Sequence, residues 1–433
     1  MKKNIISVFV FFLSITSFSQ KINDRASALS YTQEEPCNFK LLPENFRSDK
    51  EIALIAVSNC KSSFQIVSKS LKQDKEVVLA AIKAYQDDYD YRYNVLDDVD
   101  PILFRDKEII LAALSGDRDY MEVIGNFGYS SLEYADITLR QNKEFVMIAI
   151  QINPNSFKYA HETLAADKEV VTLALNFQNE EMEPLFGDVD ESLRKDKELA
   201  KLAVERNGNN FEYVDISLRG DMDLITTALN YDSDLFKYVD KSILKDRNNI
   251  IQLLTTNGYV LEFLSNSERK DKDLVKIALN YSGQTLKYAN SSMKKDLEIV
   301  LFALNESGIA LEFAHKSLKK DKKVVMLAVN KDGRALKFAD ESFQKDREVV
   351  LAAIKQNPYS LEFADNSFKK DKEVVLMAIL KKIDAFQYAD ISLKKDKEVV
   401  IEAMKLNHKV YKYIDETLKN DKDILELMKK NKE

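Results

Sequence analysis

Apolar residues recur along the chain in short runs, and each run follows a polar segment that contains an Asp. After Asp371, for example, the residues from Val374 to Ile379 are all apolar. An Asp is a favoured N-cap because its carboxylate accepts hydrogen bonds from the free backbone N–H groups of a first helical turn. A helix that is apolar on most sides has to be buried on most sides. The pattern therefore predicts a buried helix of about eleven residues after each such Asp.

The predicted helices end at a glycine or at an Asn-Pro pair, because glycine tolerates positive φ and proline cannot continue a helix. The glycines in question are Gly208, Gly258, Gly283, Gly308 and Gly333. A second, shorter helical segment follows, in which Leu361, Ala364 and Phe368 have the i, i+3, i+7 spacing of a core-facing side. An Asp, Asn or Ser then precedes the last turn of each repeat as a further cap, and we expect His161 and His315, which occupy this position, to have the same structural role.

Three other positions recur with the same period. An alanine stands seven residues after most of the capping Asp residues, as at Ala303 and Ala378, which lets neighbouring helices approach closely. A row of Phe and Tyr is expected to form a core ladder with its hydroxyl groups at the rim. The residue before each aromatic residue alternates in charge from one repeat to the next. If the repeats stack, each of these side chains has oppositely charged side chains in the repeats before and after it, which is favourable. The residues are Glu212, Lys237, Glu262, Lys287, Glu312, Lys337 and Glu362.

These features define a tandem repeat. The capping residues are Asp49, Asp74, Asp106, Asn142, Asp167, Asp196, Asp221, Asp246, Asp271, Asp296, Asp321, Asp346, Asp371, Asp396 and Asp421, and from Asp196 onward the period is 25 residues. A strict short period is typical of a solenoid, in which each unit buries its apolar face against its neighbours. The predicted fold is all-α, an elongated α-helical repeat solenoid of about fifteen 25-residue units.

The repeat pattern D-K-E-V-V-x-x-A-I-x-x-N-[GP]-x-x-L-x-[FY]-A-D-x-S-[LF]-K-K resembles that of the domain-of-unknown-function 4116 family. The resemblance covers residues 49–433, and residues 74–141 depart most from the pattern. It implies an all-helical repeat array without a known reaction, and it gives no indication of a substrate.

The first 19 residues have the features of a secretory signal peptide, because Lys2 and Lys3 precede an apolar run that ends near the small residues Ser17 and Ser19. We expect cleavage after Ser19 and export to the periplasm or the extracellular space. In the mature chain no apolar segment approaches the roughly 18 residues of a membrane span. The period then divides it into an N-terminal cap segment at 20–48, irregular repeats with insertions at 49–195, and regular repeats at 196–433.

The chain has two cysteines, Cys37 and Cys60, both close to the mature N-terminus. An oxidising compartment would allow them to form a disulfide. Alternatively, they are two separate buried thiols that pack as small apolar side chains. Neither arrangement indicates catalysis, since His161 is the nearest histidine in the sequence and a nucleophilic Cys needs a base beside it.

Charge is distributed unevenly along the chain. Residues 20–270 contain 30 basic and 44 acidic side chains, a net charge of −14, whereas residues 271–433 contain 32 and 27, a net charge of +5. This asymmetry predicts head-to-tail self-association. Lysine pairs at the repeat junctions form a candidate basic edge, made of Lys294, Lys295, Lys319, Lys320, Lys369, Lys370, Lys394 and Lys395. The neighbouring Asp and Glu residues offset this charge, and the lack of Arg enrichment argues against nucleic acid as the partner.

Two function classes remain open. The sequence favours a non-enzymatic interaction scaffold, exported from the cell, that presents an extended surface to a protein or polysaccharide partner, with no cofactor. The alternative is an enzyme or calcium-dependent binder that uses the inserted loops of the N-terminal repeats, where Asp87, Asp88, Asp90, Asp97, Asp98 and Asp100 are concentrated. The EF-hand spacing, with its central Gly and its Glu at the twelfth position, is absent, so an acidic solvated loop remains the simpler interpretation.

The repeat at 246–270 departs from the pattern at two core positions. Leu253 replaces the recurrent alanine, and Glu268 stands where other repeats have Leu, Ile, Met or Phe. An extra side chain in a tight helix contact costs about 1–3 kcal/mol unless the backbone adjusts. A carboxylate in the core row needs solvent or an N–H or cationic partner. Leu253 and Glu268 therefore mark a candidate structural joint or binding notch, with neutral drift as the simpler explanation.

Overall fold

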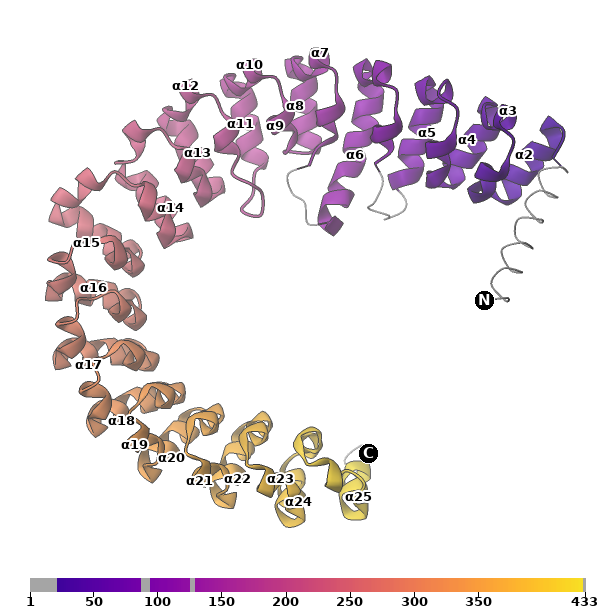
Figure 1. Cartoon of the computed structure of the whole chain (residues 1–433). Helices are drawn as coiled ribbons and strands as arrows, with labels where there is room; N and C mark the ends of the chain where they lie inside the picture. Colours follow the sequence, from indigo (N-terminus) through magenta and orange to yellow (C-terminus); the bar gives the residue numbers. More distant parts are fainter. Residues whose placement is uncertain (1–21, 87–93, 125–128, 431–433) are drawn as a thin grey trace, which may run out of the picture. The chain divides into compact units, whose positions relative to one another are not determined.

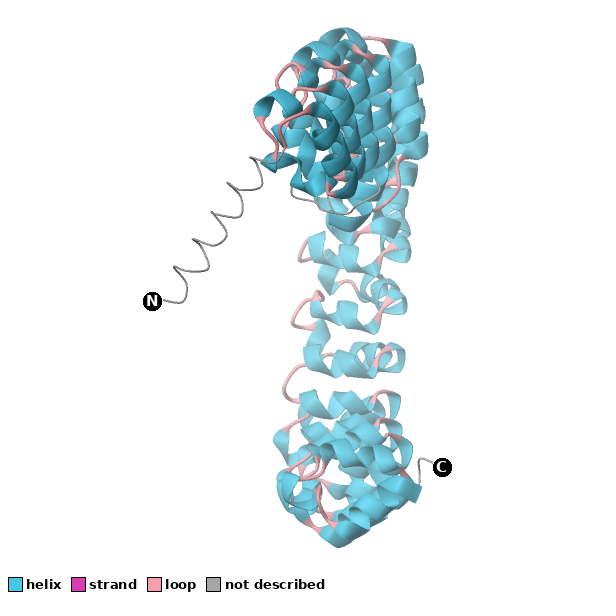
Figure 2. Ribbon diagram, turned by 90° about the vertical axis from the view of Figure 1, so that its right-hand side faces the viewer, coloured by secondary structure: helices cyan, strands magenta, loops and turns pink. Residues whose placement is uncertain are grey.

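The computed structural model describes residues 22–86, 94–124 and 129–430, and every regular element within them is a helix (Figures 1 and 2). The fold is an all-α repeat solenoid. The chain forms two compact units, the first ending at Tyr231 and the second beginning at Asp232. Within each unit, the long helices stack side by side in chain order (Figure 1).

Each repeat contributes one long helix. In the first unit these are α2 (Arg25–Glu34), α4 (Lys50–Asn59), α5 (Lys75–Gln86), α6 (Lys107–Ile124), α8 (Lys143–Ile152), α11 (Lys168–Phe177), α13 (Lys197–Arg206) and α14 (Met222–Tyr231). In the second unit they are α15 (Arg247–Thr256), α16 (Lys272–Tyr281), α17 (Leu297–Glu306), α18 (Lys322–Lys331), α20 (Arg347–Gln356), α22 (Lys372–Lys381), α24 (Lys397–Leu406) and α25 (Lys422–Lys430).

A second segment follows each long helix, usually as a 3-10 helix. These segments are η1 (Pro36–Leu41), η2 (Lys61–Ile66), η4 (Val95–Asp98), η6 (Ser131–Tyr134), α9 (Ser156–Tyr159), η7 (Leu185–Asp188), η8 (Gly208–Tyr213), η10 (Ser233–Tyr238), η12 (Gly258–Phe263), η14 (Gly283–Lys287), η16 (Gly308–Phe313), η18 (Gly333–Phe338), η19 (Pro358–Phe363), η20 (Ile383–Tyr388) and η21 (His408–Tyr413). The predicted short helical segment is present only in part. Leu361 lies in η19, but Ala364 is extended and Phe368 lies in the following turn, so the three residues do not share one helix. The second segments have the tighter 3-10 geometry in most repeats.

A short turn completes each repeat and leads into the next capping residue. The turns are α3 (Glu44–Arg47), η3 (Leu71–Gln73), η5 (Pro101–Arg105), α7 (Ile137–Arg140), α10 (Glu162–Ala165), α12 (Glu191–Arg194), η9 (Ile216–Leu218), η11 (Lys241–Lys245), η13 (Glu268–Lys270), η15 (Met293–Lys295), η17 (Leu318–Lys320), α19 (Glu341–Gln344), α21 (Asn366–Lys369), α23 (Ile391–Lys395) and η22 (Glu416–Leu418). The prediction for the histidines in this position is confirmed, because Nδ1 of His161 and of His315 caps the turn that follows.

The capping role of the recurrent Asp is also confirmed. At α22, Oδ1 of Asp371 accepts hydrogen bonds from the backbone N–H groups of Glu373 and Val374, at 3.0 and 3.2 Å. The helix buries Val374, Val375, Ala378 and Ile379, but the two residues between these pairs are only half-buried. The long helix is therefore buried on one side, less completely than its continuous apolar run predicts, because the second segments cover a single face of the helical layer.

The recurrent glycines have a different role from the predicted one. The long helices end at residues in an extended conformation, such as Ser307 with φ of −149° and ψ of 113°, rather than at a residue with positive φ. A Cβ atom added at Gly308 would lie 2.4 Å from the carbonyl oxygen of Ala328 in the next repeat. Glycine is needed there because the second segment approaches the neighbouring helix too closely for a side chain.

The first repeat begins earlier than the sequence pattern predicts. Asp24 lies 25 residues before Asp49, and its carboxylate accepts the backbone N–H of Ser27 to cap α2. α2, η1 and α3 reproduce the order long helix, 3-10 helix, turn. The segment 20–48, predicted as a cap outside the array, thus contains a complete repeat at residues 24–48, which makes sixteen in the described part of the chain. This repeat is difficult to recognise in the sequence because Tyr31 stands where the other repeats have the recurrent alanine.

One backbone hydrogen bond recurs between neighbouring repeats. The N–H of the residue that caps each short turn donates to a carbonyl oxygen of the preceding repeat, as from His315 to Lys294 at 2.9 Å and from Asp365 to Gln344 at 2.9 Å. Six repeats of the second unit have this bond, which begins at Asn290, His315, Asp340, Asp365, Asp390 and Asp415. The bond supplements the continuous apolar core and fixes the register of successive repeats.

Candidate functional site

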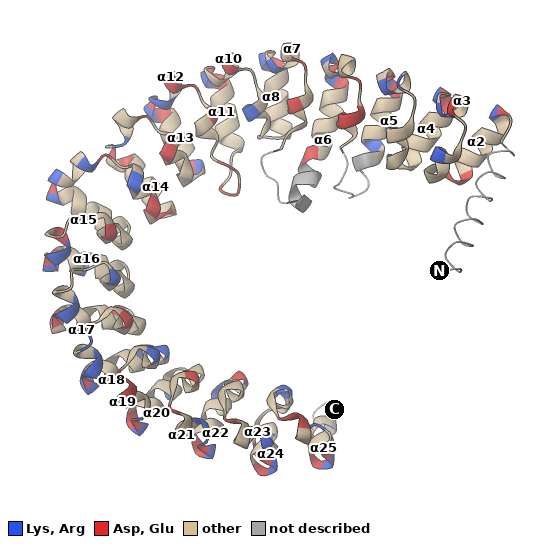
Figure 3. Ribbon diagram, viewed as in Figure 1, with Lys and Arg blue, Asp and Glu red and all other residues tan. Residues whose placement is uncertain are grey.

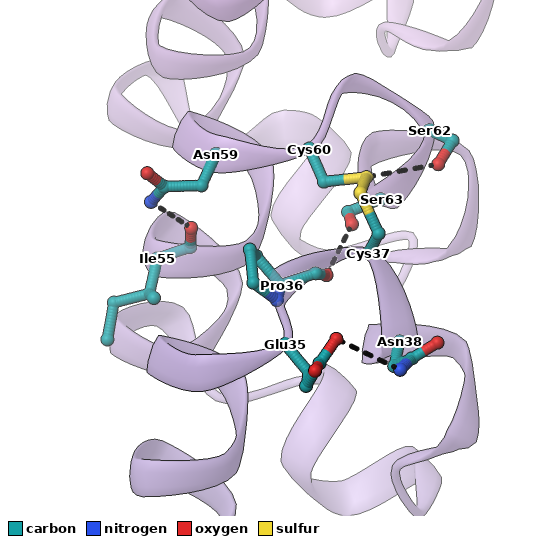
Figure 4. The surroundings of a disulfide bond; sticks show 9 residues. All are labelled: Glu35, Pro36, Cys37, Asn38, Ile55, Asn59, Cys60, Ser62 and Ser63. Atoms are coloured by element: carbon teal, nitrogen blue, oxygen red, sulfur yellow. Dashed lines mark hydrogen bonds between the residues drawn. A yellow bond between two sulfur atoms is a disulfide. The ribbon is translucent and has the colours of Figure 1, made fainter.

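The two cysteines lie in the first two repeats and form a disulfide (Figure 4). Cys37 is in η1 and Cys60 caps the end of α4, with their Cα atoms 5.2 Å apart. Beside them, the hydroxyl group of Ser63 donates to the carbonyl oxygen of Pro36 at 3.2 Å. The bond therefore attaches the first described repeat to the repeat after it.

Charged residues recur near the starts of the long helices in both units (Figure 3). The basic residue that follows a capping Asp binds the capping carboxylate of the next repeat, as in Lys272–Asp296 at 2.6 Å and Lys322–Asp346 at 2.7 Å. The hydrogen bond from Lys272 holds the pKa of Asp296 below its usual value. Each of these carboxylates thus caps one helix and binds the cation of another, so most of this acidic and basic surface is used within the fold.

The lysine pairs of the candidate basic edge contain two kinds of side chain. The first lysine of a pair is half-buried: Nζ of Lys294, Lys319 and Lys394 donates to a backbone carbonyl oxygen seven residues earlier, at 2.5, 2.7 and 2.6 Å. Burial lowers the pKa of all three. The second lysines, Lys295, Lys320, Lys370 and Lys395, are exposed. Two of them pair with a carboxylate of the next repeat, Lys320 with Asp340 at 3.6 Å and Lys395 with Asp415 at 3.9 Å. Lys369 is half-buried like the other first lysines.

The aromatic row is half-buried along its length, and its hydroxyl groups reach rim carboxylates where these are present. The hydroxyl group of Tyr134 donates to Asp97, and that of Tyr413 donates to Asp384, both at 2.6 Å. Lysines of the alternating charge row lie over the neighbouring rings, as Lys337 does over Phe338 and Phe363. This arrangement favours a structural role for the row, with cation–π contacts bridging adjacent repeats.

The acidic loop predicted as a candidate calcium site lies partly outside the described residues, since Asp87, Asp88 and Asp90 are not among them. The three acidic residues that are described bind different partners. Asp97 accepts from Tyr134, Asp98 pairs with Lys72 at 2.5 Å, and Asp100 caps η5 through the backbone N–H of Ile102. Among the described residues, no group of three or more His, Cys, Asp or Glu side chains is arranged to hold a metal ion.

A buried carboxylate that the sequence analysis did not single out lies in the irregular repeats. Asp117, in α6, is 2% exposed. Its Oδ2 atom accepts hydrogen bonds from the backbone N–H of Ser131 at 2.7 Å and from Nδ2 of Asn153 at 3.0 Å, and its Oδ1 atom accepts from the Ser131 hydroxyl at 2.5 Å. The adjacent hydroxyl groups of Ser130 and Ser156 are 2.8 Å apart. The group therefore joins two consecutive repeats, 106–141 and 142–166, through polar bonds.

Burial raises the pKa of Asp117 to about 6, although hydrogen bonds from Ser131 and Asn153 act in the opposite direction. A perturbed, buried carboxyl group is a feature of catalytic sites, but also of structural networks. Here all three described donors already occupy the carboxylate oxygens. We interpret this group as a structural link between the irregular repeats, where insertions interrupt the regular period.

The candidate joint has the partner that the sequence analysis required. Oε2 of Glu268 accepts the backbone N–H of Ser265 at 2.7 Å. In the six repeats of the second unit that follow, the equivalent N–H binds the preceding repeat instead. Leu253 is fully buried. Glu268 thus replaces a bond between repeats with a bond inside one repeat, and this is the specific local difference at 246–270.

None of the described helices combines the length and the apolar composition that a membrane crossing requires. Neither a curated protein nor a solved structure matches the chain. The family described as "Domain of unknown function (DUF4116)" matches it repeatedly, at residues 28–72, 49–94, 106–165, 167–219, 221–269, 271–319, 321–369, 346–394, 371–419 and 396–432. The first match begins inside the repeat at 24–48, and together the matches span most of both units. The chain belongs to the DUF4116 family.

Proposed function

We propose that the chain is an exported, non-enzymatic interaction scaffold that presents an extended surface to a protein or polysaccharide partner. The observation that carries this proposal is the link between neighbouring repeats of the second unit. The apolar core recurs in every repeat, the backbone hydrogen bond recurs from Asn290 onward, and the ion pair recurs in most repeats, with Leu297 as one exception. Such links place equivalent surface positions of successive repeats next to one another, which is how solenoids form extended binding surfaces.

The chemistry of the polar residues supports this proposal. The recurrent Asp residues cap helices. The first lysine of each junction pair, such as Lys319, donates to a backbone carbonyl group, and the buried Asp117 accepts hydrogen bonds from three donors. The side chains that remain available are the exposed lysines and acidic residues, the half-exposed tyrosines and the variable residues at the ends of the long helices. These groups suit recognition over many contacts, each of modest strength.

Export is supported by the signal-peptide features of residues 1–19 and by the disulfide, since disulfides persist in oxidising compartments. Periplasmic and extracellular locations are both consistent with this proposal. Head-to-tail self-association is a related proposal that rests on the net charges of −14 for residues 20–270 and +5 for residues 271–433. Light scattering at low and high salt tests it, because an association driven by these charges weakens as salt increases.

The alternative, an enzyme or calcium-dependent binder in the inserted N-terminal loops, remains a prediction. The three described acidic residues at 97–100 bind separate partners, which gives it no support, and residues 87–93 and 125–128 are outside the described structure. The two functions differ in which part of the chain they need. A loop site needs the irregular repeats, whereas an extended surface needs the whole array.

Deletion of whole repeats distinguishes the two functions. Partners are first identified by proximity labelling and pull-down with residues 20–433, and affinity is then measured for chains that lack residues 296–320 or residues 296–345. For an extended surface we expect affinity to fall further with each repeat removed. Unchanged affinity in both deletions, together with loss on mutation of the N-terminal loops, would overturn the scaffold proposal in favour of the loop site.

A further inference from the structure

An open hollow of about 390 Å³ lies on the second unit, at the ends of three consecutive long helices. Its volume is within the range of roughly 300–1,000 Å³ that is common for ligand sites. The polar side chains that line it are Asp332, Arg334, Gln356, Asn357, Tyr359 and Lys382. Pro358 completes the wall.

The hollow occurs where the repeat pattern changes. Gly258, Gly283, Gly308 and Gly333 precede it at equivalent positions, and a Cβ at Gly333 would lie 2.3 Å from the carbonyl oxygen of Ala353. The next two repeats have Pro358 and Ile383 at this position. A larger residue cannot approach the neighbouring carbonyl group as closely as glycine does. The repeats are therefore less tightly apposed at this edge, which gives a physical reason for the hollow.

Two walls of the hollow are held in place by hydrogen bonds. The guanidinium group of Arg334 binds both carboxylate oxygens of Asp332, with an Nη2–Oδ2 distance of 2.7 Å. The side-chain amide of Gln356 accepts the N–H of Gly333 at 2.6 Å and donates to the carbonyl oxygen of Lys331 at 3.0 Å. These groups do not need to be ordered by a ligand, so binding would cost little side-chain entropy.

Lys382 contradicts the local rule of the repeat. It stands at the N-cap of η20, where Asn357 and Asn407 accept a backbone N–H in their own repeats, and a lysine has no atom that can accept one. Its side chain is exposed. Its ammonium group makes no hydrogen bond or ion pair with the described part of the chain. Ser307 also leaves its segment without a side-chain cap, but a serine can accept the N–H, whereas Lys382 places an exposed cation at this position.

The hydrogen-bonding atoms of the hollow suit an anion. The acceptors are occupied: Asp332 binds Arg334, Oε1 of Gln356 binds Gly333, and Oδ1 of Asn357 accepts the N–H of Tyr359 at 3.0 Å. The remaining donors are Nζ of Lys382, Nδ2 of Asn357, the Tyr359 hydroxyl group and the N–H groups that Arg334 does not use for Asp332. With one acidic and two basic side chains, the lining has a net charge of +1.

A half-exposed aromatic ring selects among anionic ligands. The Tyr359 ring forms part of the wall and is braced edge-to-face by Tyr388, at a centroid distance of 6.4 Å. A flat ring beside fixed donors fits the apolar C–H face of a sugar ring whose substituents include an acceptor group. An acidic peptide would use the lysine and arginine, but would have no comparable need for the ring.

We propose that this hollow binds the carboxylate-bearing sugar residue of an acidic polysaccharide. Lys382 and Arg334 contact the carboxylate, Asn357 donates to a hydroxyl group, and the sugar ring lies against Tyr359. This inference rests on the polysaccharide form of the proposed function and names its substrate class. It also fits the surrounding unit, because residues 232–433 contain 38 basic and 33 acidic side chains.

The test measures binding of a galacturonic acid trimer to the mature chain, residues 20–433, by calorimetry. The neutral methyl ester of the same trimer and a hexaglutamate peptide are the comparison ligands. Lys382→Asn removes the cation and restores a capping acceptor. We expect it to weaken trimer binding by about tenfold or more, as for a lost charged hydrogen bond, and to raise the melting temperature. Tyr359→Leu should weaken trimer binding but leave any hexaglutamate binding unchanged.

Lys409→Asn is the matched control, because Lys409 is exposed in the next repeat and its replacement changes the net charge equally. We expect this variant to bind the trimer as the unchanged chain does. Equal binding of the trimer by the Lys382 variant would overturn the proposal, as would tighter binding of hexaglutamate or of the methyl ester. If the unchanged chain binds no trimer, the hollow proposal fails, while the scaffold proposal is still decided separately by the repeat deletions.

Discussion

Single residues determine how closely neighbouring repeats approach. The recurrent alanine of one long helix and the recurrent glycine of the preceding repeat meet at backbone distance, as at Ala328 and Gly308. Polar residues have equally local roles, since each Asp caps the helix that it precedes. Glu268 and Lys382 are exceptions in which the usual residue type is missing and a different bond, or none, takes its place.

Replacement of Gly308 by alanine should destabilise the second unit. The added Cβ would lie 2.4 Å from the carbonyl oxygen of Ala328, so the repeats must move apart. We expect a loss of about 1–3 kcal/mol in the free energy of unfolding, as for other overpacked contacts. Urea unfolding measures it, with Asn366→Ala on the exposed turn as the control. A variant as stable as the unchanged chain would show that there is room for a side chain between Gly308 and the carbonyl group of Ala328.

Asp117 should give the first unit a characteristic dependence on pH. Its pKa is about 6 in the folded chain and near 3.8 in the unfolded chain, so folding favours the protonated form. The contribution to stability is therefore greatest below pH 3.8 and is lost as the pH rises toward 6, by about 3 kcal/mol. Asp117→Asn does not titrate. We expect the stability of the unchanged chain relative to this variant to fall by about 2 kcal/mol between pH 4 and pH 7.

Urea unfolding at several pH values measures this difference, and Asp234→Asn at an exposed side chain serves as the control. Parallel pH profiles for the unchanged chain and the Asp117 variant would show that this carboxyl group has an ordinary pKa.

Residue roles could be predicted from the sequence where their causes are local. Asp371 and His315 were identifiable as caps because the N–H groups that they bind follow directly in the chain. Asp117 could not be identified, because its partners Ser131 and Asn153 lie 14 and 36 residues away in irregular repeats. The glycines were identified as important for the wrong reason, since sequence alone does not distinguish a need for positive φ from a need for close approach.

At the level of whole elements, each repeat consists of one long helix, one 3-10 segment and one turn, held to the next repeat by few polar bonds. The sequence predicted this order, but neither the extended residue at Ala364, which ends the second segment, nor the complete repeat at 24–48. α2 has few apolar residues and buries only Ala28 and Thr32. A repeat whose long helix buries so few side chains has a weak apolar core, so the disulfide has most effect there.

Loss of the disulfide should loosen the first repeat alone. The bond closes a loop of 23 residues, for which the chain-entropy estimate is about 3 kcal/mol. In a Cys37→Ser, Cys60→Ser variant we expect faster amide hydrogen exchange in α2 and η1, with unchanged exchange in α5 and beyond. Mild reduction of the unchanged chain should have the same effect. Equal protection of α2 in both proteins would show that packing alone holds this repeat.

Restoration of the regular residue at position 268 should strengthen the link between two repeats of the second unit. Glu268→Leu removes the carboxylate that holds the N–H of Ser265 and leaves that N–H available to the carbonyl group of Leu244, the equivalent acceptor. We expect a gain of about 1–2 kcal/mol from this bond and from apolar burial. Thermal unfolding measures it, with Glu262→Leu as an exposed control. A lower melting temperature would show that the existing cap is the better solution.

For the whole molecule, the account explains stability as a sum over similar repeats and their interfaces. The period, the all-α class and the family resemblance could be predicted from the sequence because they depend on recurrence. The division into two compact units at Tyr231 and the hollow beside Lys382 could not, because both arise from contacts that differ among repeats of similar sequence.

The central claim is that each regular repeat is an interchangeable unit of 25 residues. Removal of residues 296–320 joins Lys295 directly to Asp321 and preserves the Lys-Lys-Asp junction. The most direct test is amide hydrogen exchange of this deletion variant, compared with one that lacks only the half-repeat 296–307. We expect the whole-repeat deletion to retain the protection of α16 and α18, and the half-repeat deletion to lose it. Loss of protection throughout the second unit after removal of the whole repeat would contradict the account.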